Sequence, residues 1–268
     1  MKYKIETFDN QSPVSNEPLP INQPSIMTFV GSRGSGKSSV ILSLIKNTYN
    51  GVFHRIIFFN PTFYRDEKYE KLLNISHILK QKPKEKKDIL SRPKNHPYLL
   101  EAKEPPFTGK INPSDVYTSN IEDNLTRIVN EKIELNNKNE KWLIVLDDIS
   151  ASGITRHPHF LEVLLNGRHL NITLWLSVQF YVSLAPPTRN QVMVWFLFNF
   201  PNINEVNRFY QENSCRLSEE DWMKIYHYAV DRPYGFLTIN HHNTHDKHKI
   251  FTDSLQNFIS IKDKENGQ

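Results

Sequence analysis

The chain has 268 residues and a mass of 31.5 kDa, and its 38% of hydrophobic residues is enough to bury a large core. It has one cysteine, Cys215, and no apolar run longer than 192–198, which excludes a disulfide scaffold, a cysteine-based zinc cluster and a membrane-spanning helix. The formal charge is +4, but residues 80–94 carry seven Lys or Arg against two acids, so the other residues sum to −1. Because the start of the chain also lacks an apolar signal-peptide core, we expect a soluble intracellular protein.

The first 24 residues contain four prolines among Asn, Gln and Ser, which predicts an extended N-terminal arm over 1–24. An apolar run at 26–30 then predicts a buried strand, and the apolar spacing over 38–46 predicts a helix that ends at Asn50-Gly51. A second apolar run at 55–59 predicts a second strand. Strand, helix and strand at this spacing form a βαβ unit with a right-handed crossover.

Residues 80–118 interrupt this pattern. They contain six prolines among many lysines, so we expect an insertion into the domain over this range. Its basic part, 80–94, suits a polyanion such as DNA, and a solvated loop explains the same composition.

The α/β pattern resumes after the insertion. The expected helices are 120–135, 160–166, 203–211 and 218–230, and the expected strands are 142–146, 172–178, 192–198 and 234–239. Continuous apolar strands between helical segments are typical of a mostly parallel sheet with helices on both faces. We therefore expect one α/β domain over 25–252, followed by a C-terminal tail over 253–268.

A phosphate-binding loop follows the first strand. The residues that fit the pattern G-x-x-x-x-G-K-[ST] are Gly31, Ser32, Arg33, Gly34, Ser35, Gly36, Lys37 and Ser38, with Ser39 next in the helix. Glycines let the backbone N–H groups face the phosphates of ATP, and Lys37 adds a positive charge there. Ser38 offers a hydroxyl to Mg²⁺. A strand, this loop and an amphipathic helix in succession predict a nucleotide site.

Two acids end the strand at 142–146. In nucleotide hydrolases with a phosphate-binding loop, a carboxylate at such a strand end reaches the metal. We expect Asp147 to hold Mg²⁺, directly or through water, and Asp148 to act as the general base that activates the attacking water.

With these elements, the chain resembles the viral genome-packaging ATPases of poxviruses and other large DNA viruses, in the FtsK–HerA branch. The resemblance covers residues 24–215 and rests on the loop at 31–38, the strand end at 146–148 and the run 167–179. It implies a RecA-like fold, a homo-oligomeric ring, and ATP-driven movement of double-stranded DNA into a capsid, with a capsid or portal protein as a further partner. It also implies a location at the site of virion assembly in the host cytoplasm, or in the virion. Many relatives have Glu where this chain has Asp148, whose carboxylate is one methylene closer to the backbone.

The resemblance also raises the question of sensing and of catalysis between subunits. Gln179, at the tip of the strand 172–178, would sense the γ-phosphate. Arg168 and Arg189 each lie beside a strand end, on the edge of the sheet where we expect the nucleotide. We expect Arg168, with Arg189 as the alternative, to stabilise the transition state in a neighbouring subunit.

Two other functions use the same phosphate-binding loop. One is a small-molecule kinase, and the other is a non-catalytic assembly factor that binds a nucleotide. The absence of a base-reading motif indicates that any DNA contact is made to phosphates, independently of sequence.

Overall fold

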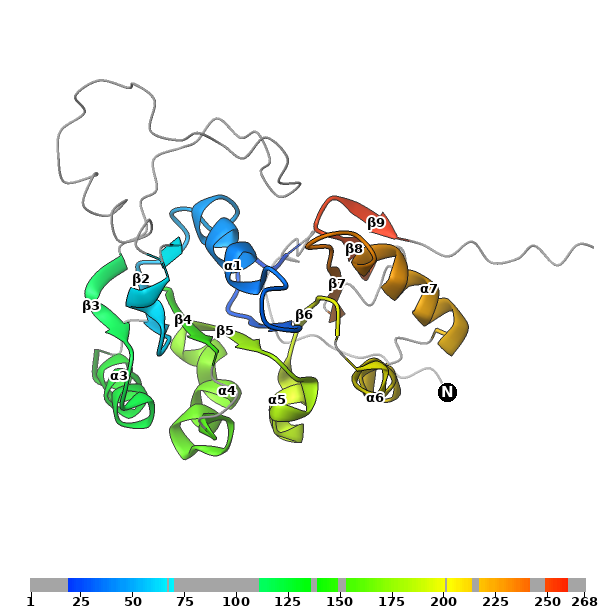
Figure 1. Ribbon diagram of the computed structural model, residues 1–268. Helices are drawn as coiled ribbons and strands as arrows, with labels where there is room; N and C mark the ends of the chain where they lie inside the picture. The colour runs from blue at the N-terminus through cyan, green and yellow to red at the C-terminus, as the bar shows by residue number, and fades with distance from the viewer. Residues whose placement is uncertain are drawn as a thin grey trace, which may run out of the picture.

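A nine-stranded sheet forms the centre of the described structure, in the order β3-β2-β4-β5-β1-β6-β7-β8-β9 (Figure 1). The structure, a computed structural model, describes residues 19–66, 68–69, 111–135, 139–148, 153–200, 202–213, 217–241 and 249–259. The strands are β1 (Ile26–Val30), β2 (Arg55–Phe59), β3 (Ile111–Tyr117), β4 (Trp142–Asp147), β5 (Ile172–Val178), β6 (Val194–Leu197), β7 (Leu237–Asn240), β8 (Phe251–Asp253) and β9 (Asn257–Ile259). The strands from β3 to β6 in this order pair in parallel, and β7, β8 and β9 add in antiparallel fashion. The predicted α/β class with a mostly parallel sheet is confirmed.

Helices cover both faces of the sheet, as expected for buried parallel strands. They are α1 (Lys37–Lys46), α3 (Ile121–Leu135), α4 (Pro158–Leu170), α5 (Pro186–Gln191), α6 (Ile203–Asn213) and α7 (Glu219–Val230). In Figure 1, α1 lies on one side of the sheet and α3, α4, α5 and α6 lie on the other. The apolar side chains of α7 join the same buried cluster as those of α3, α4 and α6, whereas those of α1 belong to a second cluster.

The strand order brings three functional segments to one edge of the sheet. β5 pairs with β1 on one side and with β4 on the other. Since all three strands are parallel, their carboxyl ends lie at the same edge. The phosphate-binding loop, Gln179 and the acids at 147–148 therefore occupy neighbouring positions there.

The structure corrects two expected boundaries. Residues 111–117, which we assigned to the insertion, form β3 at the edge of the sheet, where Pro113 is tolerated because an edge strand leaves backbone groups unpaired. The sheet also continues past residue 252, since β8 pairs with β7 and β9 pairs with β8. The domain therefore extends into the expected C-terminal tail.

The end of the expected N-terminal arm packs on the domain. Leu19 is 1% exposed, and the hydroxyl of Tyr49 donates a hydrogen bond of 3.2 Å to the carbonyl of Pro20. The remainder of the arm and the basic segment 80–94 lie outside the described residues.

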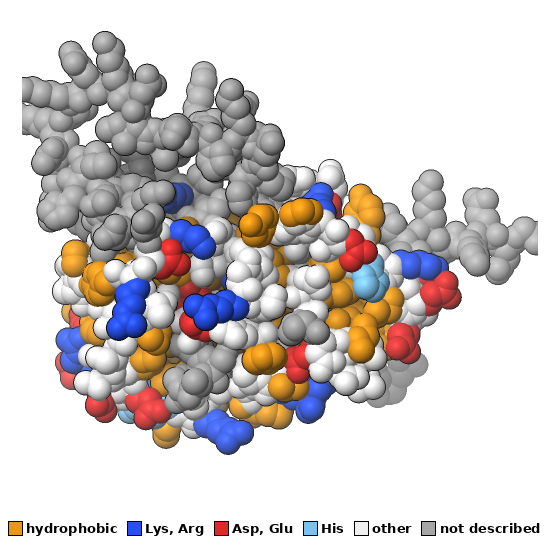
Figure 2. Space-filling view, viewed as in Figure 1, with side chains coloured by type: hydrophobic (Ala, Val, Ile, Leu, Met, Phe, Trp, Pro, Cys, Tyr) orange, Lys and Arg blue, Asp and Glu red, His pale blue; other side chains and the backbone are white. Residues whose placement is uncertain are grey.

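The described surface has no extended region of one charge on the face in Figure 2, where basic and acidic side chains are interspersed. Within the described ranges, every helix is too short or too polar to cross a bilayer.

Candidate active site

The phosphate-binding loop connects β1 to α1 and is tied to neighbouring strands. The N–H of Gly31 donates to the carbonyl of Val178 at 3.3 Å, and the N–H of Ser32 donates to the carbonyl of Asn199 at 3.4 Å. A Cβ at Gly31 would lie 2.5 Å from the Cβ of Phe198, and Gly36 has a φ of +104°. The loop therefore requires glycine at both positions, for close packing at one and for backbone conformation at the other.

Lys37 is the first residue of α1, and its side chain crosses the loop. Its ammonium group donates hydrogen bonds to the carbonyls of Gly31, at 2.7 Å, and Ser32, at 2.9 Å. Burial lowers the pKa of Lys37 below its ordinary value, while the charges of Asp147 and Asp148 oppose that shift. The structure thus brings this positive charge close to both acids.

Asp147 is the buried acid of the site, with 3% of its surface exposed. The hydroxyl of Ser38 donates a hydrogen bond of 3.1 Å to its Oδ2 atom. A serine hydroxyl and a carboxylate are hard oxygen ligands that Mg²⁺ accepts, and this ion commonly completes its shell with water and phosphate oxygens. The two predicted metal ligands are therefore adjacent and chemically suited to Mg²⁺. No cluster of three or more His, Cys, Asp or Glu that could hold a metal occurs in the described ranges.

Two further residues hold Asp147, and sequence reasoning missed both. The amide of Asn60 donates a hydrogen bond of 3.2 Å to Asp147 Oδ2, and the hydroxyl of Tyr69 donates another to the same atom. Burial and the neighbouring carboxylate raise the pKa of Tyr69, which keeps its hydroxyl protonated as a donor. The position of Asn60 at the carboxyl end of a strand next to β4 was a usable signal, whereas nothing in the sequence pointed to Tyr69.

Asp148 differs from Asp147 in conformation and exposure. It is exposed at the end of β4 and has a φ of +57°, in the left-handed region. The amide of Gln179 donates a hydrogen bond of 2.9 Å to its Oδ1 atom. The structure thus joins the expected base to the expected sensor.

The remaining residues of the loop frame the same space. Arg33 and Gly34 are exposed at its tip, and Ser39 follows Ser38 in the first turn of α1. The hydroxyl of Ser35 is buried and makes no hydrogen bond to any described residue. A buried polar atom in a phosphate-binding loop fits a loop that binds an anionic ligand.

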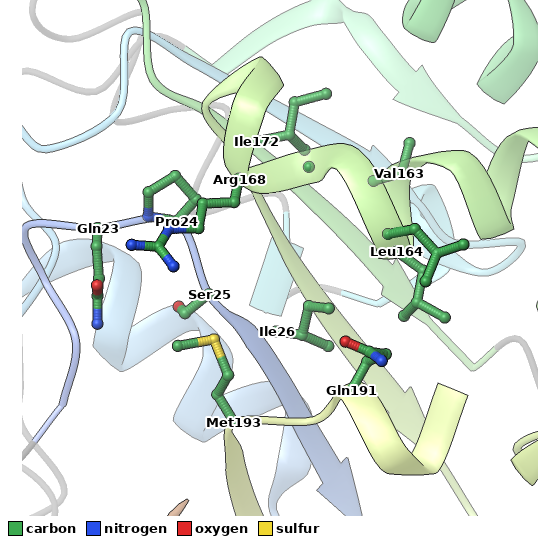
Figure 3. Close-up of a pocket in the computed structure, with 12 residues that line it drawn as sticks. Gln23, Pro24, Ser25, Ile26, Val163, Leu164, Arg168, Ile172, Gln191 and Met193 are labelled. Carbon is green, nitrogen blue, oxygen red and sulfur yellow. The ribbon is translucent and has the colours of Figure 1, made fainter. Parts of the chain in front are cut away.

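Arg168 lies at the opposite edge of the sheet from the phosphate-binding loop, where the parallel strands have their amino ends. It is exposed near the end of α4 and, together with Gln23, Pro24 and Ser25, lines a cavity of about 220 Å³ (Figure 3). Since β1 begins at this cavity and has five residues, the cavity and the phosphate-binding loop are roughly 16 Å apart. The sequence expectation placed Arg168 on the nucleotide edge, and that placement is wrong. An arginine that precedes a parallel strand lies at its amino end, whereas the phosphate-binding loop follows the carboxyl end.

Arg189 is bound within its own chain. It is 6% exposed, and its Nε and Nη2 atoms donate to the carboxylate of Glu212 at 2.7 and 3.0 Å. Its Nη1 atom donates to the carbonyl of Leu184 at 2.7 Å. These contacts join α5 to α6, so the structure does not support Arg189 as a donor to another subunit.

Comparison with known families supplies an independent observation. The family model described as "Poxvirus A32 protein" matches residues 114–258, more than half of the chain. The chain belongs to the poxvirus A32 protein family. This confirms the viral resemblance seen in the sequence. The matched range of this A32-family chain includes Asp147, Asp148, Arg168 and Gln179, whereas the phosphate-binding loop lies before it and is identified by its own residues.

Solved structures from two Sulfolobus viruses share this fold. The DNA-packaging ATPase B204 of Sulfolobus turreted icosahedral virus is 18% identical with a TM-score of 0.55, over 86% of this chain and 97% of that one. The genome-packaging NTPase B204 of Sulfolobus turreted icosahedral virus 2, in complex with ATP-gammaS, is 17% identical with a TM-score of 0.53, over 83% and 95% of the two chains. At such identities the likeness establishes the fold. No curated protein sequence matches this A32-family chain significantly.

Proposed function

We propose that this A32-family protein is an ATPase that drives double-stranded DNA into a viral capsid. The observation that carries the proposal is the meeting of the phosphate-binding loop, Asp147, Asp148 and Gln179 at three adjacent strand ends. Membership in the poxvirus A32 family and a fold shared with DNA-packaging ATPases support the same function.

Each residue of the site has a role in hydrolysis that its position supports. The N–H groups of the loop and the ammonium group of Lys37 bind the β- and γ-phosphates. Ser38 and Asp147 hold Mg²⁺, which neutralises charge on the phosphates when it is bound. Asp148 accepts the proton of the attacking water, and Gln179 orients the Asp148 carboxylate through the 2.9 Å hydrogen bond.

The working assembly in this proposal is a homo-oligomeric ring at the site of virion assembly in the host cytoplasm. A capsid or portal protein is its further partner. DNA passes through the ring, with contacts to its phosphates rather than its bases.

An ATPase assay with and without double-stranded DNA tests the proposal. We expect hydrolysis that DNA stimulates and that Lys37→Ala abolishes while the circular dichroism spectrum stays that of the wild type. Lys224→Ala is a matched control. Lys224 is 63% exposed on α7, so this substitution removes the same charge at a position away from the site. Transfer of phosphate to a small acceptor would instead indicate a kinase, and nucleotide binding without turnover would indicate a non-catalytic assembly factor.

A further inference from the structure

Tyr234 lies beside the phosphate-binding loop, although no motif includes it. A Cβ built at Gly36 would lie 3.4 Å from Cδ1 and 3.8 Å from Cβ of Tyr234. The tyrosine therefore flanks the residue that directly precedes Lys37. It is nevertheless 51% exposed, so much of its ring faces outward beside the loop.

The backbone at Tyr234 is held in an unfavourable conformation. Its φ is +61°, in the left-handed region, which is unfavourable for a residue with a side chain. A bulky residue in this region is uncommon, and such strain concentrates at functional sites. Asparagine or glycine at this position would relieve the strain. The presence of an aromatic residue there therefore suggests that its ring has a function.

The turn around Tyr234 is fixed on both sides. A Cβ at Gly235 would lie 2.3 Å from the carbonyl oxygen of Ala229, so only glycine fits there. The guanidinium of Arg232 donates a hydrogen bond of 2.8 Å to the hydroxyl of Ser254 and pairs with the carboxylate of Asp253. The ring is thus presented from a rigid position.

The sheet order places Tyr234 on the side of the loop away from the acids. β4 and β5, which carry Asp148 and Gln179, lie on one side of β1, and β6 and β7 lie on the other. Tyr234 precedes β7, whose first residue, Leu237, pairs with Leu197 at the end of β6. A triphosphate with its γ-phosphate toward the acids directs its nucleoside toward the β6–β7 side of the loop.

We propose that Tyr234 stacks against the base of the bound nucleotide. This inference rests on the proposed function, since it concerns the same nucleotide. The buried ring of Phe198 lies 5.1 Å from that of Phe236, and its Cε1 atom would lie 3.8 Å from a Cβ at Gly36, so a buried aromatic pair packs beside the same residue of the loop. Stacking on an aromatic ring depends little on base identity, so ATP and GTP should bind with similar affinity.

The test compares a nucleotide with a ligand that lacks the base. Calorimetry measures the binding of a non-hydrolysable ATP analogue and of inorganic tripolyphosphate, both with Mg²⁺, to wild type, Tyr234→Asn and Tyr234→Phe. Asparagine tolerates the left-handed backbone, so the turn is retained. We expect Tyr234→Asn to weaken binding of the ATP analogue about tenfold. This corresponds to about 1.4 kcal/mol of binding free energy, within the range for base stacking. Tripolyphosphate binding should not change, and Tyr234→Phe should bind both ligands like the wild type.

Tyr228→Asn is the matched control, because Tyr228 is 66% exposed on α7 and its loss should affect neither ligand. Unchanged binding of the ATP analogue to Tyr234→Asn would overturn the inference. Equal weakening of both ligands would also overturn it, because Tyr234 would then act through the shape of the loop. A wild-type protein that binds neither ligand would contradict the proposed function itself, a result distinct from the other two.

Discussion

The side-chain amide of Gln179 donates a hydrogen bond of 2.9 Å to the carboxylate of Asp148. This contact links the tip of β5 to the tip of β4, and β5 also pairs with β1, which leads into the phosphate-binding loop. In the proposed mechanism, a displacement of the γ-phosphate would therefore act on Asp148 and Gln179 together. The predictions for the two residues follow from this contact.

Asp148→Asn should separate nucleotide binding from hydrolysis. The amide cannot accept the proton of the attacking water, whereas Ser38 and Asp147 still offer their oxygens to Mg²⁺. We expect turnover to fall by about 10²–10⁴, the usual contribution of general base catalysis. Binding of a non-hydrolysable ATP analogue, measured by calorimetry, should remain that of the wild type. Hydrolysis at the wild-type rate would show that another group is the base.

Gln179→Ala should reduce turnover about 10- to 150-fold with little change in KM, because hydrogen bonds to charged groups contribute about 1.5–3 kcal/mol and about 1.4 kcal/mol is tenfold. If Gln179 acts by orienting Asp148, its loss should cost nothing further once Asp148 is Asn. Steady-state kinetics of the two single variants and the double variant measure this coupling. Losses that add independently would assign Gln179 a role separate from Asp148.

Tyr69→Phe should raise the Mg²⁺ requirement. The Tyr69 hydroxyl donates to the Asp147 oxygen that also accepts from Ser38 and Asn60, so it helps to orient the carboxylate. Loss of such supporting contacts weakens metal binding by about 10–100-fold, and we expect about a tenfold rise in the Mg²⁺ concentration for half-maximal ATPase activity. Tyr64→Phe, at a side chain that is 53% exposed, is the control. An unchanged or lower Mg²⁺ requirement would exclude this role for Tyr69.

Local patterns in the sequence were sufficient to predict most of the sheet and the centre of the site. The phosphate-binding loop and the acids at 147–148 each follow a continuous apolar run, and parallel strands bring such ends to one edge. The strand β3 escaped prediction because Asn112, Pro113 and Ser114 interrupt its apolar pattern, which an exposed edge strand tolerates.

Contacts that depend on three-dimensional packing could not be predicted in the same way. Tyr69 reaches Asp147 from a position 78 residues earlier in the chain, and Tyr234 reaches the phosphate-binding loop from the far end of the domain. Neither contact has a short-range pattern. The position of Arg168, in contrast, could have been predicted from the sequence, since the direction of the parallel strands determines at which end of them it lies.

Arg168 should act on the nucleotide of a neighbouring subunit. It lies at the edge of the sheet away from its own phosphate-binding loop, so catalysis within one subunit is geometrically excluded. Lys37→Ala and Arg168→Ala should each be nearly inactive alone. A mixture should recover part of the activity, because an intact pocket then meets an intact arginine in some rings. Mixed rings that remain inactive would show that another arginine stabilises the transition state. Arg208 is exposed on α6, so Arg208→Ala controls for the loss of one positive charge.

The basic segment 80–94 should bind the DNA backbone, a prediction that rests on the sequence because the segment lies outside the described residues. It holds an excess of five positive charges in a chain whose total is +4. Phosphate contacts by lysine release counterions, so log affinity falls with log salt by about 0.9 per contact. Replacing Lys82, Lys84, Lys86 and Lys87 with Gln should therefore reduce the magnitude of this slope by up to about 3.6 in filter-binding or anisotropy titrations. Basal ATP hydrolysis should persist, because these lysines belong to neither the phosphate-binding loop at 31–38 nor the acids at 147–148. The matched control replaces Lys68, Lys138, Lys141 and Lys224 with Gln, which removes the same charge from other parts of the chain. An unchanged slope in the first variant would identify the segment as a solvated loop and direct the search for the DNA surface to the loops after the other strands.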